Sequence, residues 1–506
     1  MVVIFRSLYI VPLLFISGHA QLLFQNTFFK FPDPFSRFRH EPRGSATERE
    51  DTNSSSGSSG AGYDGQWELV SENSGVSAMH AILLPKINKV LMYDATIWKI
   101  SKIPLPPQKM PCRIVDRTTG ELDCWCHSVL FDIETSKLKA LKLETDTWCS
   151  SGGLTVDGNL VSAGGNGGGA NTVRYLSTCS TCDWTEYSTA LADPRWYSTQ
   201  VTLPDGGFIV VGGRVIREFP VLPGGSRNYP ASGMSALLPI NLHSGHAKAG
   251  SAEVLICGGA KWDSFYFSET RKQFLPALQD CGRITITEHN PSWKIEQMPS
   301  PRVMGDIMIL PTGDMLMLNG AKRGTSAWND ADDPNFVPVL YRPNAAENER
   351  WKELAATTIP RMYHASAVLL PDGKVLVAGS NTNDGYKFDA KYPTELRVEK
   401  FSPPYLDPAL ARLRRLIVKI RSNKKRLNKD DLAVTMYAPA FTTHGISMNQ
   451  RLIILNLVEV INNVWPGIHS LIAEAPSSGA VAPPGYYLLY VVYKGVPSVS
   501  MWVQIK

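Results

Sequence analysis

Short apolar runs joined by tight polar turns recur along most of this chain. The clearest copy spans residues 365–379, where two apolar runs flank the turn Leu370-Pro371-Asp372-Gly373. Two extended runs separated by a Pro-Asp-Gly turn are typical of a β-hairpin. The other copies are LLPKINKVLMYD from Leu83, LTVDGNLVSAGG from Leu154, TLPDGGFIVVGG from Thr202, AEVLICGG from Ala252 and ILPTGDMLMLNG from Ile309. The pattern therefore predicts an all-β protein built from repeated hairpins.

The glycines that end these hairpins set the length of the repeat. Gly164, Gly212, Gly258, Gly320 and Gly379 are 48, 46, 62 and 59 residues apart. A repeat of about 50 residues that holds only strands and turns is typical of a four-stranded blade of a kelch-type β-propeller. Six copies are visible, and we expect a seventh blade from the segments around Glu218 to Met234 or from both ends of the domain. A single irregular sandwich, the alternative, does not explain the repetition.

The pattern changes near residue 400. The segment FSPPYLDP spans residues 401–408, and five short alternating runs follow it in about 100 residues. This density of strands predicts an immunoglobulin-like β-sandwich. The predicted domains are therefore a seven-bladed kelch-type propeller over residues 63–398 and an immunoglobulin-like domain over residues 399–506.

Residues 1–62 lack the hairpin pattern. An apolar run at residues 8–16, after a basic residue and before small residues, predicts a secretory signal peptide over residues 1–20. That run is too short to span a bilayer and no later stretch is long enough, so we expect no membrane segment. Residues 21–62 end in NSSSGSSGAG, a flexible and disordered composition, and Asn53 there is a candidate N-glycan acceptor. We expect a secreted, extracellular protein.

Composition and charge add less than the pattern does. The chain has 506 residues, 43% of them hydrophobic, and its formal net charge of +5 is small for this size. Nine of the eighteen residues at 412–429 are Lys or Arg. We interpret them as the solvated face and turn of an edge strand, with an acidic cell-wall polysaccharide as the alternative partner. A secreted chain is not expected to bind nucleic acid.

The eight cysteines fit an oxidising compartment. Proximity along the chain suggests three disulfides, Cys112–Cys124, Cys179–Cys182 and Cys257–Cys281. Cys126 and Cys149 are left over. They form either a fourth disulfide or two free thiols, of which Cys149 would have chemistry of its own.

Side chains that can bind metal lie just upstream of several hairpins. Tyr363 and His364 are adjacent, and neighbours on a regular strand face opposite sides, so the two can converge only on a bent backbone. A phenolate and a neutral imidazole together suit a transition metal. The equivalent upstream positions of other copies hold Met79-His80, Trp148-Cys149, Trp196-Tyr197 and Val303-Met304. In a propeller, such loops meet near the axis.

Other histidines carry weaker signals. His444 lies on a loop within TTHGISMNQR and, taken alone, is typical of a surface or turn residue. We interpret His80 and His127 as packed or surface residues. His243 and His246 are spaced like ligands on a helix face but lie in a Gly/Ser-rich loop, so we expect no metal site there.

Together, the motifs resemble the copper radical oxidases, a family that includes galactose oxidase and glyoxal oxidase. The matching segments are TWCSSGG around Cys149, PRWYSTQ around Tyr197, PRMYHASAVLLPDG around Tyr363 and His364, FSPPYLDP at residue 401, TTHGISMNQR around His444, and VAPPGYYLLYVVYKGVPSVSMWV near the C-terminus. The resemblance covers residues 66–506. It is closer to plant glyoxal-oxidase-like proteins, because galactose oxidase has an extra N-terminal carbohydrate-binding module.

The resemblance implies one copper ion and a modified tyrosine. Tyr197, Tyr363, His364 and His444 would be the copper ligands, with Tyr363 also the general base. Tyr197 would be joined to the sulfur of Cys149 by a thioether, forming a radical cofactor. Copper and the radical would together oxidise an aldehyde, as its hydrate, to a carboxylic acid and reduce O2 to hydrogen peroxide.

Two departures from the family pattern bear on this interpretation. In galactose oxidase a tryptophan stacks over the thioether, and here that register holds Arg214-Val215. The difference weakens the case for galactose as the substrate and favours small aldehydes. It also implies that the radical is less shielded. Cys126 stands where we would expect alanine in relatives, and it is either a free thiol or a competitor of the suggested disulfides.

The predicted protein is a monomer that acts on a small aldehyde and O2 in the apoplast or cell wall. Two alternatives stay open. One is a non-enzymatic kelch propeller that binds an extracellular glycan or protein with the same loops. The other is an alcohol oxidase of galactose type.

Overall fold

The computed structural model describes residues 62–97, 101–106, 110–116, 118–211, 220–243, 251–410, 414–416, 419–421 and 426–506. Residues 63–506 form one compact unit. The predicted signal peptide, nearly all of the Ser/Gly-rich segment with Asn53, and the positions Arg214-Val215 and His246 lie outside the described residues. None of the described helices is long and apolar enough to cross a membrane.

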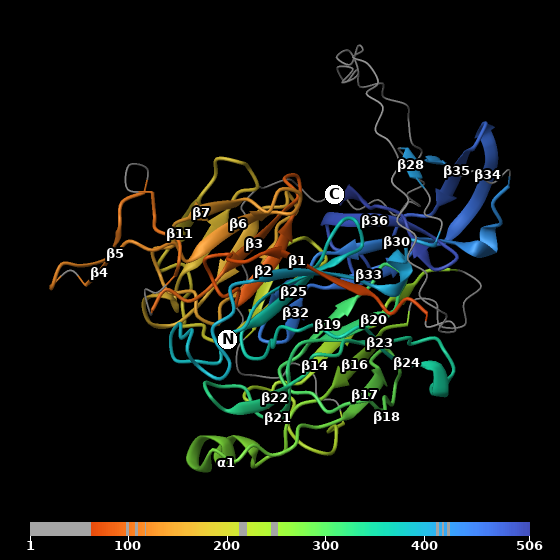
Figure 1. Cartoon of the computed structure of the whole chain (residues 1–506). Helices are drawn as coiled ribbons and strands as arrows, with labels where there is room; N and C mark the ends of the chain where they lie inside the picture. Colours follow the sequence, from red (N-terminus) through yellow and green to blue (C-terminus); the bar gives the residue numbers. More distant parts are fainter. Residues whose placement is uncertain are drawn as a thin grey trace, which may run out of the picture. The chain divides into compact units, whose positions relative to one another are not determined.

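The predicted hairpins are present as antiparallel groups that follow one another along the chain (Figure 1). The first two groups are β2 (His80–Leu84), β3 (Lys89–Tyr93), β6 (Ser128–Asp132) and β7 (Leu138–Leu141), then β8 (Ser151–Leu154), β9 (Leu160–Ala163), β10 (Val173–Leu176) and β11 (Trp184–Tyr187). A two-stranded group follows, β12 (Thr199–Thr202) and β13 (Phe208–Val211).

Three further groups complete the series. They are β14 (Met234–Leu237), β16 (Glu253–Cys257), β17 (Asp280–Thr285) and β18 (Lys294–Gln297); β19 (Asp306–Ile309), β20 (Met315–Leu318), β23 (Val339–Tyr341) and β24 (Trp351–Glu353); and β25 (Ala365–Leu369), β26 (Val375–Gly379), β27 (Val398–Ser402) and β1 (Gln66–Ser71). The protein is therefore all-β, as predicted.

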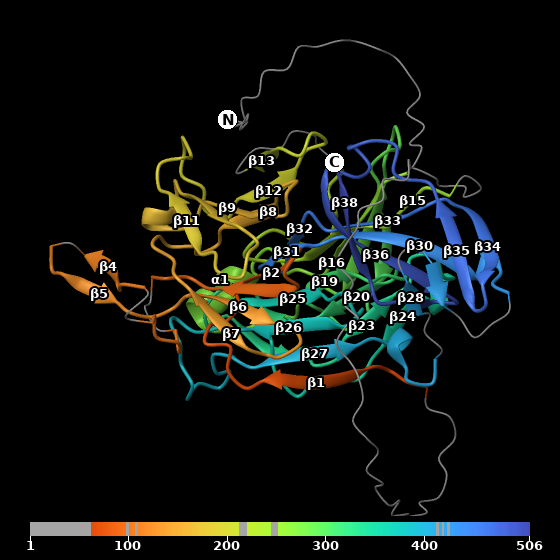
Figure 2. The same cartoon turned by 90° about the horizontal axis from the view of Figure 1, so that it is seen from above.

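The last group joins both ends of the predicted propeller. Strand β1 pairs antiparallel with β27, with Gln66 opposite Ser402 and Leu69 opposite Glu399. Figure 2 shows β25, β26, β27 and β1 in succession. The two ends of the domain complete the sixth group rather than a seventh. The strands that the structure describes contain no further group of this kind, so the predicted count of seven is not confirmed.

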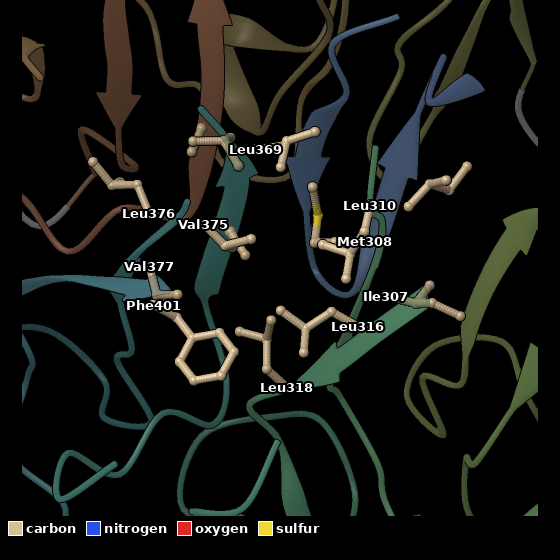
Figure 3. Packing of buried hydrophobic residues seen from close by; sticks show 14 of the residues in the cluster. Ile307, Met308, Leu310, Leu316, Leu318, Leu369, Val375, Leu376, Val377 and Phe401 are labelled. Carbon is tan, nitrogen blue, oxygen red and sulfur yellow. The ribbon is translucent and has the colours of Figure 1, made fainter. Parts of the chain in front are cut away.

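Apolar strands buried on both faces form the main core. Every residue of β19, β20, β25 and β26 is buried. Figure 3 shows Leu316 and Leu318 of β20 near Val375 and Val377 of β26, with Phe401 beside them. Strands covered on both sides have near-continuous apolar sequences rather than strict alternation. The continuous runs in these hairpins are explained by this double burial.

A hairpin from the C-terminal region lies among the first strands of the six groups. It consists of β31 (Phe441–Thr443) and β32 (Ile446–Met448). Strand β31 pairs antiparallel with β2, and β32 pairs in parallel with β14. The hairpin also contacts β8, β12, β19 and β25, so it touches the first strand of all six groups. The two predicted domains are thus tied together by main-chain pairing.

The remaining C-terminal strands form two sheets. One contains β33 (Arg451–Ile454), β30 (Leu432–Ala438), β36 (Gly485–Tyr493), β37 (Val496–Pro497) and β38 (Met501–Ile505), and is extended by β15 (Ile240–Asn241), which pairs in parallel with β33. The other contains β28 (Arg414–Leu416), β29 (Lys419–Arg421), β35 (Ile468–Ala473) and β34 (Leu457–Trp465). The basic segment at 412–429 supplies the edge strand β28, and part of it lies outside the described residues.

The described residues also contain two short strand pairs and one α-helix. They are the pairs β4 (Arg113–Asp116) with β5 (Glu121–Asp123) and β21 (Ala321–Gly324) with β22 (Ala331–Pro334), and the helix α1 (Ser264–Arg271). The sequence analysis did not predict this helix. It interrupts the connection between β16 and β17.

The three suggested disulfides are confirmed. Bonds join Cys112 to Cys124, Cys179 to Cys182 and Cys257 to Cys281. The alternative of a fourth disulfide is wrong, because Cys126 and Cys149 are both free and buried.

Candidate active site

Loops enter several inner strands through a residue in the left-handed backbone conformation. The φ angles are 57° at Cys149 before β8, 58° at Tyr197 before β12, 52° at Met304 before β19 and 62° at His364 before β25. His444, between β31 and β32, has a φ of 53°. This conformation is uncommon for residues other than glycine and costs free energy. The predicted backbone bend at the Tyr-His pair is therefore present, and it recurs at equivalent positions.

The five residues singled out by the sequence converge at this end of the strands. The hydroxyl oxygens of Tyr197 and Tyr363 are 3.3 Å apart, and Cys149 Sγ is 3.2 Å from His444 Nε2. The ring centroids of His364 and His444 are 4.7 Å apart, and those of Tyr363 and His364 are 3.8 Å apart. The Tyr197 amide donates a hydrogen bond to the Cys149 carbonyl oxygen at 3.2 Å. The structure brings all five side chains together.

Burial keeps both imidazoles of the cluster neutral. It lowers the pKa of His444 to about 3 and the pKa of His364 well below its usual value. A neutral imidazole has a free lone pair and is the form that binds metals. His444 Nδ1 lies 2.6 Å from Thr443 Oγ1, which leaves Nε2 facing the cluster. His364 Nε2 is buried and has no hydrogen-bond partner among the described residues.

Burial has the opposite effect on the acidic groups of the cluster. It raises the pKa of the Cys149 thiol and of the Tyr197 and Tyr363 hydroxyls far above their usual values. The neighbouring acidic groups raise the pKa of both hydroxyls further, whereas the Tyr197 hydroxyl partly offsets the rise at Cys149. These groups stay protonated in the absence of a cation. A bound cation favours the deprotonated form of a phenol, because its positive charge stabilises the phenolate directly.

The donor set fits a transition-metal ion. Two imidazole nitrogens and two phenol oxygens face one region, and an orphaned nitrogen such as His364 Nε2 requires an explanation because buried polar atoms are normally paired. Across the part of the chain that the structure describes, no three His, Cys, Asp or Glu side chains are arranged to hold a metal. A metal at this cluster would therefore need the phenol oxygens.

Tyr229 is a member of the cluster that sequence reasoning missed. Its ring centroid is 4.5 Å from that of Tyr197, with 31° between the planes, and its hydroxyl accepts a hydrogen bond from Tyr363 at 3.4 Å. The expectation of a less shielded Tyr197 rested on Arg214-Val215, which lie outside the described residues. The ring of Tyr229 covers Tyr197 instead. The sequence feature that could have indicated Tyr229 is its position upstream of β14. The sequence analysis overlooked β14 because its hairpin with β16, which contains AEVLICGG, lacks the tight turn of the other copies.

Three tryptophans extend the aromatic cluster. Trp196 lies 5.0 Å from Tyr197 and 5.2 Å from Trp148 by ring centroids. Trp148 is stacked on Trp328 at 5.3 Å with 15° between the planes. The sequence analysis noted the dipeptides with Trp148 and Trp196 but gave these rings no role, and Trp328 has no hairpin motif to mark it.

The other described histidines that the sequence singled out make structural contacts, and His80 lies beside the cluster, with its ring centroid 6.4 Å from that of His444. His80 is buried, with its ring stacked on Tyr93 at 4.4 Å. His127 is also buried, and its Nε2 lies 2.8 Å from a carboxylate oxygen of Asp123. His243 Nδ1 lies 2.9 Å from Asn456 Oδ1.

Comparison with known proteins identifies the family. The family model for the glyoxal oxidase N-terminus matches residues 79–216 and 214–405. The chain belongs to the glyoxal oxidase family. A second model, the galactose oxidase-like early set domain, matches residues 409–505. The resemblance inferred from the motifs is confirmed.

Curated relatives span most of the chain. Aldehyde oxidase GLOX1 of Arabidopsis thaliana is 51% identical over 523 residues, which covers 88% of this chain and 85% of that protein. Aldehyde oxidase GLOX of Vitis pseudoreticulata is 35% identical over 523 residues, covering 88% of this chain and 98% of that protein.

A solved structure shares the fold. It is described as a novel fungal alcohol oxidase with catalytic diversity among the AA5 family, in complex with copper, and it matches with a TM-score of 0.62 at 18% identity. The match covers 88% of this chain and 100% of that one. The two stretches of the glyoxal oxidase match meet at residues 214–216, between β13 and β14. The junction of the two stretches follows β12 and β13, the group in which the structure describes two strands.

Proposed function

We propose that this protein is a copper-dependent oxidase that converts aldehydes to carboxylic acids and reduces O2 to hydrogen peroxide. The observation that carries the proposal is the meeting of Cys149, Tyr197, Tyr363, His364 and His444 in a member of the glyoxal oxidase family. Two relatives that align with 88% of the chain are named aldehyde oxidases, which supports the substrate class.

The phenol oxygens of Tyr197 and Tyr363 and the imidazoles of His364 and His444 would hold the copper ion. Cys149 would supply the sulfur of a thioether to Tyr197, with loss of one hydrogen from each residue. O2, the oxidant of the proposed reaction, would accept the two hydrogens and leave as hydrogen peroxide. Its free thiol, its burial and the hydrogen bond from the Tyr197 amide to its carbonyl oxygen support this assignment. Bound copper and the oxidised, sulfur-modified phenol would each accept one electron and together oxidise the substrate by two electrons.

Tyr363 is the residue proposed to accept the substrate proton. Its hydroxyl oxygen lies between those of Tyr197, at 3.3 Å, and Tyr229, at 3.4 Å. A general base must lie within hydrogen-bond reach of the proton that it removes. Tyr363 and His364 are each only 2% exposed, so water is excluded from this side of the site.

The proposal extends to domain organisation and location. Residues 63–398 are proposed to form a kelch-type propeller and residues 399–506 an immunoglobulin-like domain, supported by the six hairpin groups and by the two C-terminal sheets. The seventh blade stays a prediction. The protein is proposed to be a secreted monomer of the apoplast or cell wall. Its three disulfides support secretion.

A peroxide assay tests the function. Copper-loaded protein should release hydrogen peroxide and form pyruvate from methylglyoxal, with little release from galactose. Removal of copper should abolish release, and copper should restore it while zinc should not, because zinc has no redox chemistry. His364→Ala should abolish activity, and His243→Ala, which changes a histidine outside the cluster, should retain it. Fully copper-loaded protein that releases no peroxide from any aldehyde would favour the non-enzymatic binding propeller.

A further inference from the structure

Two large aromatic side chains are exposed beside Tyr197. Trp196 is 49% exposed and Tyr229 is 42% exposed, and both rings contact the Tyr197 ring, with centroids 5.0 and 4.5 Å away. A solvent-exposed indole or phenol leaves apolar surface in water, and concave ligand sites are lined by such surface. The two rings therefore flank the proposed oxidising group on its accessible side.

Both rings are held in place by contacts behind them. Trp196 rests against Trp148, which is stacked on Trp328. The hydroxyl of Tyr229 accepts a hydrogen bond from Tyr363, and the carbonyl of the next residue, Pro230, accepts one from the Ser326 amide at 2.8 Å. A surface that is fixed before a ligand arrives loses less entropy when the ligand binds. This backing is typical of a binding site rather than of loose surface residues.

We propose that Trp196 and Tyr229 form a subsite for a planar ring and that aromatic aldehydes are the substrate class of this site. The proposal rests on the proposed oxidase function. The aldehyde carbon would lie toward the hydroxyls of Tyr197 and Tyr363, and the ring of the substrate would lie against the two exposed side chains. For benzaldehyde the balance is one aldehyde, one O2 and one water giving one benzoic acid and one hydrogen peroxide.

The contacts of the subsite favour a flat apolar ring over a sugar. The rings that Trp196 and Tyr229 touch are themselves aromatic, namely Trp148, Tyr197 and Tyr363. Recognition of a sugar requires several directed hydrogen-bonding groups. Among the described residues, the hydroxyls of Tyr197 and Tyr363 lie beside this pair, and the proposed chemistry already uses them. Offset or edge-to-face stacking needs only the ring faces and edges that are present here.

The test compares two substrates within each variant. Trp196→Leu and Tyr229→Leu remove one ring each, and Trp262→Leu is the matched control, because Trp262 is 78% exposed and lies before α1. The ratio of kcat/KM for benzaldehyde to that for methylglyoxal cancels any general damage to the copper site. The ratio should fall about 3- to 10-fold in each ring variant, as expected for the loss of one aromatic contact, and stay unchanged in the control.

A binding measurement keeps the subsite and the enzymatic function separate. Acetophenone carries the same ring but no oxidisable aldehyde hydrogen, so its calorimetric titration needs no turnover. Acetophenone should bind the unmodified protein and the control, and bind the two ring variants more weakly. If these binding differences appear while no aldehyde is oxidised, the result supports the subsite and contradicts the oxidase function. Equal acetophenone binding in all variants, or no acetophenone binding to the unmodified protein, would overturn the subsite.

Discussion

The two proposed histidine ligands have different partners at their ring nitrogens. His364 Nε2 is buried without a hydrogen bond in the described structure, whereas His444 Nδ1 lies 2.6 Å from Thr443 Oγ1. A hydrogen bond to one ring nitrogen selects the tautomer and fixes the orientation of the other nitrogen. Thr443 therefore positions His444 for the proposed copper ion without touching it.

Replacing Thr443 should weaken copper binding. Thr443→Val keeps the shape of the side chain and removes its hydroxyl, so copper affinity should fall about 10- to 100-fold. Thr443→Ser keeps the hydroxyl and should bind copper nearly as well as the unmodified protein. Competition between the protein and a chelator measures the affinity directly. Equal affinity in the Val and Ser variants would show that the hydroxyl does not orient the imidazole.

Motifs predicted the residues of the cluster more completely than they predicted its surroundings. Cys149, Tyr197, Tyr363, His364 and His444 all lie within distinctive segments, and the structure brings them together. Tyr229 and Trp328 escaped a functional assignment for a physical reason. Their importance comes from contacts between loops that are distant in sequence, and no local pattern records which loops meet.

At the scale of elements, the hairpin β31–β32 carries His444 to the cluster. Gly445, the next residue, has a φ of 74°, and a Cβ atom there would lie 2.5 Å from the carbonyl oxygen of Gly305. Only glycine combines this backbone conformation with such a close approach. The sequence of the hairpin tip thus fixes how near His444 comes to the loop before β19.

Adding one methyl group at the hairpin tip should disturb copper binding. Gly445→Ala forces the tip away from Gly305, so we expect a copper affinity at least about 10-fold lower and a reduced Tm. Gly495→Ala is the matched control, because Gly495 has a similar φ of 77° but no atom within 4 Å of the added Cβ. The control should lose only about 1 kcal/mol of stability and keep its copper affinity. Equal copper affinity in both variants would contradict this role of the tip.

The hydrophobic pattern predicted the hairpins but not how strands from distant regions pair. An apolar run flanked by turn residues shows that a strand exists and, where residues alternate, which face is buried. It contains no information on the partner strand. For that reason the pairing of β31 with β2 and of β15 with β33 emerged only from the structure. The predicted count of seven blades had the same weakness, because six copies are visible in the sequence and the seventh was inferred without knowing which strands pair.

At the scale of the whole molecule, buried carboxyl groups link folding to pH. Asp94 is 2% exposed, and its carboxyl accepts hydrogen bonds from the Tyr386 hydroxyl and the Ala95 amide, each at 2.7 Å. Burial raises the pKa of Asp94 from 3.8 to about 7. The folded protein therefore binds this proton more tightly than the unfolded chain does. The stability that the proton contributes is complete below pH 4 and is lost as the pH rises through 7.

Removing the ionisable carboxyl of Asp94 should reduce the dependence of the unfolding free energy on pH. The Tm of Asp94→Asn, relative to that of the unmodified protein, should increase between pH 4 and pH 8, corresponding to at most about 4 kcal/mol of unfolding free energy. Asp116→Asn is the contrasting control, because the Thr118 and Thr119 amides lower the pKa of Asp116. Its relative Tm should fall as the pH rises toward about 5, around and below the usual pKa of an aspartate, and stay level from there to pH 8. A relative Tm of Asp94→Asn that does not change with pH would contradict the assignment.

The central claim of this account is that Cys149 and Tyr197 form one covalent redox group beside a copper ion. Peptide mass spectrometry of copper-loaded protein, after reduction and proteolysis, tests it most directly. The account predicts that the peptides with Cys149 and Tyr197 stay joined, with two hydrogens fewer than their sum, and that they separate in Cys149→Ser. A free Cys149 peptide, recovered in full from protein that holds one copper ion per chain, would contradict it.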